Sequence, residues 1–302
     1  MFLWRAKVRG YLFAIAATAI WSGNFVVARG LSDSIPPVSL AFWRWVVAVI
    51  VFLPFGLRPL IAERNLLKPN LRYLVVTAFL GITVFNTLIY VAGHTTSALN
   101  LSLISIIFPI FVILLMRVFY GERIGVRKVF GITLVITGVI MLITKGNLAV
   151  LMDISFAVGD IWMLTAALIF AIFSIQLKRK PKDMSIWALQ FSLFIVGLIF
   201  LLPLYVWETR MTAPVQWDMT TVGSILYIGV FASFAAFLLW NYAVMSIGPA
   251  KAGMVYYMLP LFSGILAFLF IGEGVSSMHL ISAVLILSGI FAANHEMPRN
   301  KA

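Results

Sequence analysis

Residues 108–122 read FPIFVILLMRVFYGE, and residues 259–273 read LPLFSGILAFLFIGE. Each stretch is an apolar run with proline in second place and Gly-Glu at its end, and the two lie 151 positions apart. A later glycine, Gly138 and then Gly289, recurs at the same offset. A weaker similarity aligns residues 17–26 with residues 165–174. The chain therefore carries an internal repeat, and this repeat decides the fold.

Apolar runs of similar length fill most of the remaining sequence. Of 302 residues, 63% are hydrophobic and 11% are charged, with a mean hydropathy of +1.07, whereas a soluble domain has about 45–50% and 25%. Runs of about 20 residues match the thickness of a bilayer core. We predict an all-α polytopic membrane protein with ten transmembrane helices, near residues 10–29, 38–57, 71–92, 95–116, 126–144, 157–177, 185–206, 220–246, 252–271 and 279–294.

The loop charges give an orientation. With the N-terminus inside the cell, cytoplasmic segments hold 18 of the 22 Lys and Arg, and the outer loops hold only Arg29, Lys145 and Arg210. Cytoplasmic loops carry such an excess, so we expect both termini in the cytoplasm. The repeats are expected at residues 1–146 and 147–302, with five spans each. Because five is odd, the halves cross in opposite senses, which predicts Glu122 at the cytoplasmic face and Glu273 at the outer face.

Inverted repeats are typical of carriers, because two similar halves of opposite orientation can exchange conformations around a central site. A duplicated bundle that transports nothing is the alternative. Pro109 and Pro260 interrupt the fourth and ninth spans, where proline removes a backbone hydrogen bond. Their matched positions predict paired hinges, and plain helix kinks remain the other interpretation.

Several residues in order along the chain resemble the EamA-type carriers of the drug/metabolite transporter superfamily, over essentially its whole length. They are Ala19, Ile20, Trp21, Ser22, Asn24, Arg44, Pro109, Glu122, Trp240, Asn241, Tyr242, Ala243, Pro260, Gly272 and Glu273. The resemblance implies a basket of ten helices with a central cavity lined by spans 1, 3, 4, 6, 8 and 9. It also implies transport of amino acids, other metabolites, nucleotide sugars or toxic cations. The seventh span departs from the family pattern, with Gln190 where an arginine is expected.

Polar and aromatic side chains within the spans are the candidate site. We expect the substrate to contact Trp21, Phe85, Asn86, Tyr90, Phe170, Trp240, Asn241, Tyr256 and Tyr257. Thr83, Asn86, Thr87 and Tyr90 share one helix face, although Asn and Thr also link neighbouring membrane helices by hydrogen bonds. Arg44 either extends to the outer surface or pairs within the bundle, and we favour pairing.

These features favour a carrier that exports amino acids, neutral and aromatic or otherwise apolar, by alternating access. The aromatic-rich cavity is most similar to that of the bacterial amino-acid exporters, which implies a bacterial inner membrane. We expect no cofactor, metal, nucleic acid or enzymatic activity, a small-molecule substrate and the bilayer as partners, and a monomer. Asp160 and His94 fall near the outer interface rather than deep in the membrane, so facilitated movement is favoured over proton exchange. Export of toxic organic cations and a non-transporting membrane protein are the alternatives.

Overall fold

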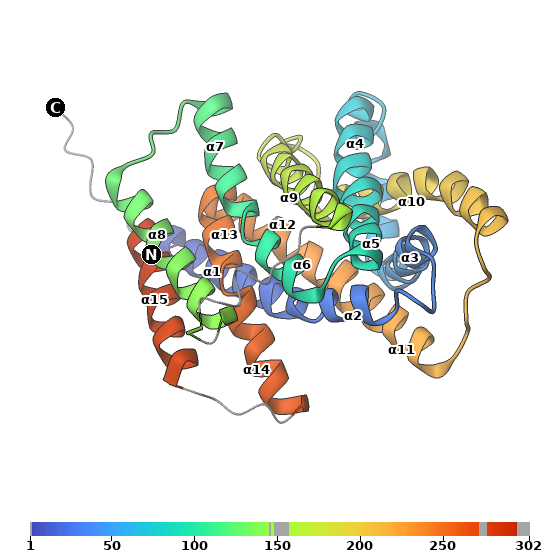
Figure 1. Cartoon of the computed structure of the whole chain (residues 1–302). Coiled ribbons are helices and arrows are strands. Elements are labelled where there is room, and N and C mark those ends of the chain that lie inside the picture. The colour runs from blue at the N-terminus through green and yellow to red at the C-terminus, as the bar shows by residue number, and fades with distance from the viewer. Residues whose placement is uncertain (1, 145, 148–156, 272–276, 295–302) are drawn as a thin grey trace.

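The computed structural model describes residues 2–144, 146–147, 157–271 and 277–294 (Figure 1). In these ranges all regular structure is helical, with no strand. Nine helical stretches there are long and apolar enough to cross a membrane, and they coincide with predicted spans 1–8 and 10. The predicted ninth span corresponds to two successive helices, Pro249–Tyr256 and Leu259–Ile271. The predicted polytopic all-α fold is therefore confirmed.

In the described part of the first half, nine helices and one short 3-10 helix follow one another. These are α1 (Phe2–Ser22), α2 (Asn24–Gly30), α3 (Pro37–Ala62), the short η1 (Arg64–Leu66), α4 (Leu71–Ala78), the π-helix η2 (Phe79–Val84), α5 (Phe85–Thr95), α6 (Ala98–Ser105), α7 (Phe108–Tyr120) and α8 (Val126–Thr144). The second half has α9 (Val158–Leu177), α10 (Ile186–Met211), α11 (Met219–Tyr227), the π-helix η4 (Ile228–Ala235), α12 (Ala236–Ile247), α13 (Pro249–Tyr256), α14 (Leu259–Ile271) and α15 (Ser277–Asn294).

The two halves share the same interruptions. The third and eighth spans each contain a π-helix, η2 and η4. The fourth and ninth spans each break just before the matched proline, so that Pro109 is the second residue of α7 and Pro260 the second residue of α14. Proline is tolerated in the first turn of a helix, where its missing N–H has no partner to lose. The repeat seen in the sequence is thus a repeat of helix architecture.

The inversion of the halves follows from α3 and α10, which occupy equivalent places in the repeat. Glu208, near the end of α10, accepts hydrogen bonds from the backbone N–H groups of Val38 (2.9 Å) and Ser39 (2.6 Å) at the start of α3. Glu63, just past the end of α3, accepts one from the N–H of Ser185 (2.8 Å) at the start of α10. The two counterpart helices are therefore antiparallel and cap each other.

The counterpart helices α8 and α15 are antiparallel as well. A Cβ atom on Gly131 would lie 2.5 Å from the carbonyl oxygen of Gly289, and one on Gly138 would lie 3.0 Å from that of Ser282. Glycine is what permits so close an approach of two backbones. In Figure 1 this pair lies at one end of the molecule, with α3 and α10 at the other.

The remaining helices interlock the halves at the centre. Helix α1 packs against α12, α13 and α14, and its counterpart α9 packs against α5, α6 and α7. Each half thus fills its core with helices of the other. Loops predicted on the same side also meet: the N–H of Gln216 donates to the carbonyl of Ser34 (2.9 Å), and Lys178 pairs with Glu122 (3.5 Å). The arrangement brings spans 1, 3, 4, 6, 8 and 9 together in the middle.

Candidate functional site

Eight aromatic side chains meet where those six spans converge, and we call them the aromatic cluster. They are Trp21 of α1, Phe85 of α5, Phe108 of α7, Phe170 and Phe173 of α9, Phe237 and Trp240 of α12, and Tyr256 of α13. Neighbouring rings in the cluster have centroids 4.3–6.5 Å apart. The six spans that the family resemblance assigns to a cavity each contribute at least one ring.

Phe170 is at the centre of the aromatic cluster. Its ring stacks on Phe85 with centroids 4.3 Å apart and 12° between planes, and Trp21 meets it nearly edge-on at 5.4 Å. The Trp240 ring lies 5.6 Å from it. Phe170 and Trp240 are at most 1% exposed, and Trp21 and Phe85 are 7% exposed. Such stacked and edge-to-face pairs are the favourable geometries for aromatic rings.

The rings of the aromatic cluster are in contact, so nothing fits between them in this conformation. Both indole N–H groups are held by the protein: Trp21 donates to the carbonyl of Ala232 (2.8 Å) and Trp240 to the hydroxyl of Ser174 (3.2 Å). A ligand can enter only when helices carrying these rings separate. The cluster therefore has the composition of an apolar binding site and the geometry of a closed one.

A second feature, the arginine cluster, adjoins the aromatic cluster. It consists of Arg44 with Asn24, Tyr90 and Ser233. The Arg44 Nε donates to the hydroxyl of Ser233 (2.7 Å), and Nη1 donates to the hydroxyl of Tyr90 (2.5 Å) and to Asn24 Oδ1 (3.5 Å). The Tyr90 hydroxyl donates to the same Asn24 oxygen (3.1 Å). Arg44 is 1% exposed, so it pairs within the bundle and does not extend to the surface.

Four of the nine predicted site residues lie outside the aromatic cluster. Tyr90 belongs to the arginine cluster. Asn86 donates to the carbonyls of Gly81 (3.1 Å) and Ile82 (3.4 Å) in the π-helix η2, where the regular α-helical hydrogen-bond pattern is interrupted. In the same helix, Thr83 donates across to the carbonyl of Gly197 on α10 (3.0 Å). The polar face of the third span thus makes intrahelical and interhelical hydrogen bonds, as the alternative interpretation proposed.

The other two predicted site residues outside the aromatic cluster are Asn241 and Tyr257. Asn241 donates from Nδ2 to Gln190 Oε1 on α10, and the Tyr257 hydroxyl is buried without a hydrogen-bond partner in the described part of the chain. Asn241 lies 151 positions after Tyr90, so the equivalent position in each half links its third span to its second. Helix α3 aligns with α10 at an offset of 149, as Pro54 and Pro203 show.

That offset can be used to compare Gln190 with Arg44. At this offset the residue of α10 equivalent to Arg44 is Leu193, and Gln190 lies about one helical turn before it. The arginine side chain is longer than that of glutamine, so Arg44 reaches Tyr90 although it starts one turn further along its helix. The contact between Arg44 and Tyr90 in the first half thus corresponds to the contact between Gln190 and Asn241 in the second.

The Gly-Glu pair at the end of the first repeated stretch, Gly121 and Glu122, has a structural role. Gly121 ends α7 with φ of 65°, and its N–H donates to the carbonyl of Arg117 while that of Glu122 donates to Met116 (3.1 and 3.3 Å). The bond from Gly121 to Arg117 is that of the αL cap, whose left-handed residue is usually glycine. Glu122 then pairs with Lys178 at the surface. Gly272 and Glu273 lie outside the described residues.

Asp160 is buried in the first turn of α9, and its carboxylate is occupied by capping contacts. It accepts hydrogen bonds from the Thr96 hydroxyl (2.5 Å), from Asn100 Nδ2 (3.1 Å) and from the Ala157 N–H (2.8 Å). These contacts tie the start of α9 to the loop between α5 and α6. His94 is half-buried at the end of α5. Neither side chain belongs to the aromatic cluster, and no cluster of potential metal ligands occurs among the described residues.

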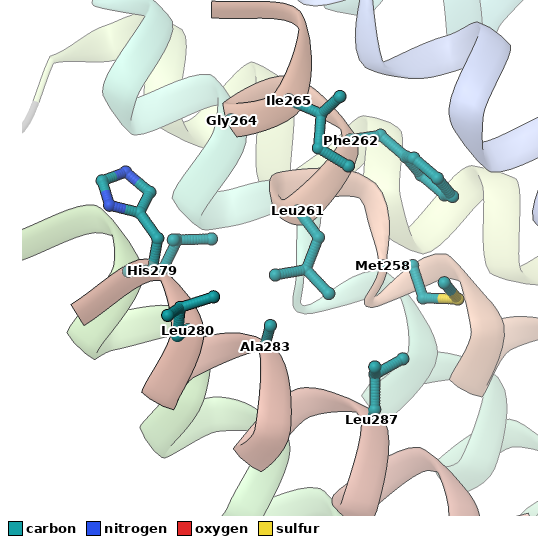
Figure 2. A pocket seen from close by; sticks show the side chains of 10 residues that line it. Met258, Leu261, Phe262, Gly264, Ile265, His279, Leu280, Ala283 and Leu287 are labelled. Atoms are coloured by element: carbon teal, nitrogen blue, oxygen red, sulfur yellow. The ribbon is translucent and has the colours of Figure 1, made fainter. Parts of the chain in front are cut away.

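A separate groove of about 320 Å³ lies between α14 and α15. Figure 2 shows Leu261, Ile265 and Leu287 facing it, with the imidazole of His279 at its edge. Its lining offers almost no polar group to orient a polar metabolite, which a specific site requires. The aromatic cluster and the adjoining arginine cluster are therefore the candidate functional site.

The fold and this site define a polytopic membrane protein built from two inverted helical repeats, the architecture of a carrier. The chain belongs to the EamA-like transporter family, whose model matches residues 8–144 and again residues 157–294. It is 23% identical over 284 residues to the uncharacterized transporter YyaM of Bacillus subtilis strain 168, covering 94% of this chain and 93% of that protein. It is 26% identical over 300 residues to a probable terminal-alkyne amino-acid exporter of Streptantibioticus cattleyicolor, covering 95% and 94%. A solved crystal structure matches with a TM-score of 0.71 at 16% identity, covering 94% of this chain and 96% of that one.

Proposed function

We propose that this transporter is a secondary carrier that exports amino acids with neutral aromatic or apolar side chains across a bacterial inner membrane. The observation that carries the proposal is the aromatic cluster, because it lies where spans from both inverted halves converge. Separation of the halves on one side or the other would open the cluster to that side. Eight rings then form an apolar wall suited to an aromatic or aliphatic side chain.

Further support comes from a relative and from the loop charges. The Streptantibioticus relative is named as an exporter of an amino acid with an apolar terminal alkyne. The excess of Lys and Arg in alternate loops favours cytoplasmic termini. We assign the chain no cofactor and no catalytic role, with the bilayer and a small-molecule substrate as partners and a monomer as the working unit. Facilitated exchange is favoured, because the Asp160 carboxylate is occupied by capping contacts.

Export of organic cations is the competing function, since aromatic walls also attract cations. The buried Arg44 beside the aromatic cluster opposes it, because its charge repels a cation.

Counterflow in proteoliposomes separates the two. Vesicles preloaded with unlabelled L-phenylalanine or L-leucine should accumulate the same labelled amino acid, and vesicles preloaded with tetraphenylphosphonium should not accumulate that cation. Accumulation of the cation alone would contradict amino-acid export.

A further inference from the structure

Arg44 is a buried cation with neutral partners. It lies seven residues after Pro37 in α3, about 10 Å along the helix, and it is 1% exposed. Its hydrogen bonds go to a serine hydroxyl, a tyrosine hydroxyl and an amide oxygen. The guanidinium carbon also lies 5.2 Å from the Trp45 ring centroid and 5.6 Å from that of Tyr90.

Within the described part of the chain, no aspartate or glutamate pairs with Arg44. Two other buried carboxylates serve helix ends: Glu208 caps α3 and Asp160 caps α9. The second terminal nitrogen of Arg44, Nη2, makes no hydrogen bond to any described residue. Among the described residues, Arg44 therefore has no carboxylate to balance its charge, and its hydrogen bonds there use only Nε and Nη1.

A buried charge without a counter-charge is costly, because neutral hydrogen bonds and ring faces replace only part of its lost hydration. The guanidinium is a planar fork whose donors match a carboxylate, and such pairs are stronger than neutral hydrogen bonds. A carboxylate that reached Arg44 would thus gain more here than at the protein surface.

The position of Arg44 connects it to the aromatic cluster. Residues 232 and 233 are consecutive in η4, and the first accepts from Trp21 while the second accepts from Arg44. Asn24 follows Trp21 by three residues, about one helical turn. Trp45, beside Arg44, has its ring 5.1 Å from that of Phe237. The guanidinium therefore lies at the edge of the apolar site.

We infer that Arg44 binds the carboxylate of the transported amino acid while the aromatic cluster holds the side chain. Tyr90, Asn24 and Ser233 are positioning residues that fix the guanidinium by three hydrogen bonds. This inference rests on the proposed function and makes it more specific: the substrate class is a monocarboxylate with an apolar body. A purely structural role for Arg44, linking spans 1, 2, 3 and 8, is the competing explanation.

The first test compares two ligands on the wild-type protein and needs no variant. In proteoliposomes that show L-phenylalanine or L-leucine counterflow, unlabelled amino acid and its carboxamide are compared as competitors. The carboxamide keeps the α-amino group and the side chain and replaces the carboxylate by a neutral amide. Loss of a buried charge-assisted hydrogen bond corresponds to about ten- to hundredfold weaker competition. Equal competition by acid and carboxamide overturns the inference and leaves the proposed function standing, whereas absence of counterflow with both amino acids refutes the proposed function and the inference with it.

Variants then assign the effect to Arg44. Arg44→Gln should weaken competition by the acid about ten- to hundredfold, leave the carboxamide nearly unchanged, and so abolish the preference. Arg44→Lys, which keeps the charge, should retain part of it. The control is Arg210→Gln, at an exposed arginine near the end of α10, which should preserve the wild-type preference. Equal losses for acid and carboxamide in Arg44→Gln would show a structural role and overturn the inference; if that variant does not fold, the wild-type comparison decides.

Discussion

Trp240 forms one wall of the aromatic cluster, and its replacement by alanine tests whether that cluster contacts substrate. Its ring lies 5.4 Å from Trp21, 5.6 Å from Phe170, 5.8 Å from Phe108 and 6.2 Å from Tyr256. A substrate side chain that enters the opened cluster takes the place of some of these neighbours. Trp240→Ala should therefore weaken binding of large apolar side chains more than binding of small ones.

The magnitude follows from this packing. An aromatic pair contributes about 0.5–1.5 kcal/mol beyond its buried area, so a bound phenylalanine deprived of one or two such ring pairs binds more weakly by about 1–2 kcal/mol. At subsaturating substrate this is a reduction in flux of about five- to thirtyfold. L-Alanine is too small to span the gap that Trp240 leaves, and its flux should fall less than twofold, roughly within the scatter of such contributions.

The assay is counterflow of L-phenylalanine and L-alanine by purified variants at equal reconstituted amounts. Trp240→Phe keeps a ring and should keep the selectivity, although it loses the hydrogen bond to Ser174. Trp207→Ala is the matched control, because Trp207 is 61% exposed and lies outside the aromatic cluster. Equal losses for both amino acids in a folded Trp240→Ala protein would show that Trp240 supports the bundle without touching substrate.

Three further outcomes are expected. Glu208→Gln should lower the free energy of unfolding of the detergent-purified protein by about 2–3 kcal/mol, because Glu208 is 4% exposed and accepts three hydrogen bonds. Glu63 is half-buried and accepts one hydrogen bond, so Glu63→Gln should lower it by about 1 kcal/mol or less. Equal shifts of melting temperature would refute reciprocal capping of unequal strength. Substrate flux should persist when an uncoupler collapses the proton gradient, and complete loss of both uptake and counterflow, reproduced by replacing Asp160 with Asn or His94 with Gln, would instead identify a coupling group. A reporter active only in the cytoplasm should work when fused after Lys182 and fail after Asp218, and the reverse pattern would invert the orientation.

The positions of the spans could be predicted from the sequence because they depend on local hydropathy. The breaks at Pro109 and Pro260 were also visible, since proline removes a backbone hydrogen bond from a helix, although α3 and α10 continue through Pro54 and Pro203. Trp21, Phe85, Phe170, Trp240 and Tyr256 do come together. That the two prolines act as hinges, and that these aromatic residues contact substrate, stay predictions.

Contacts between helices could not be predicted, because they depend on how the helices pack and not on the sequence of any one span. Phe108 and Phe173 were missed as cluster members because phenylalanine is common on lipid-facing surfaces too. The reciprocal caps by Glu63 and Glu208 join residues far apart in the chain, so only the packed fold reveals them. Arg44 was singled out from the sequence, but its partners lie on three other spans.

Transport by alternating access requires that the aromatic cluster opens in turn to the two sides of the membrane. The chain contains no cysteine, so single cysteines report accessibility without further engineering. Ser174 is fully buried beside Trp240, and Ser174→Cys changes little more than one atom. Lys182→Cys and Gln216→Cys, in opposite loops, serve as one-sided controls for right-side-out and inverted vesicles treated with a membrane-impermeant maleimide. Alternating access at this site predicts that Cys at position 174 is labelled from both sides and that L-phenylalanine slows the labelling; labelling from one side only, or a rate that the amino acid does not change, would contradict it.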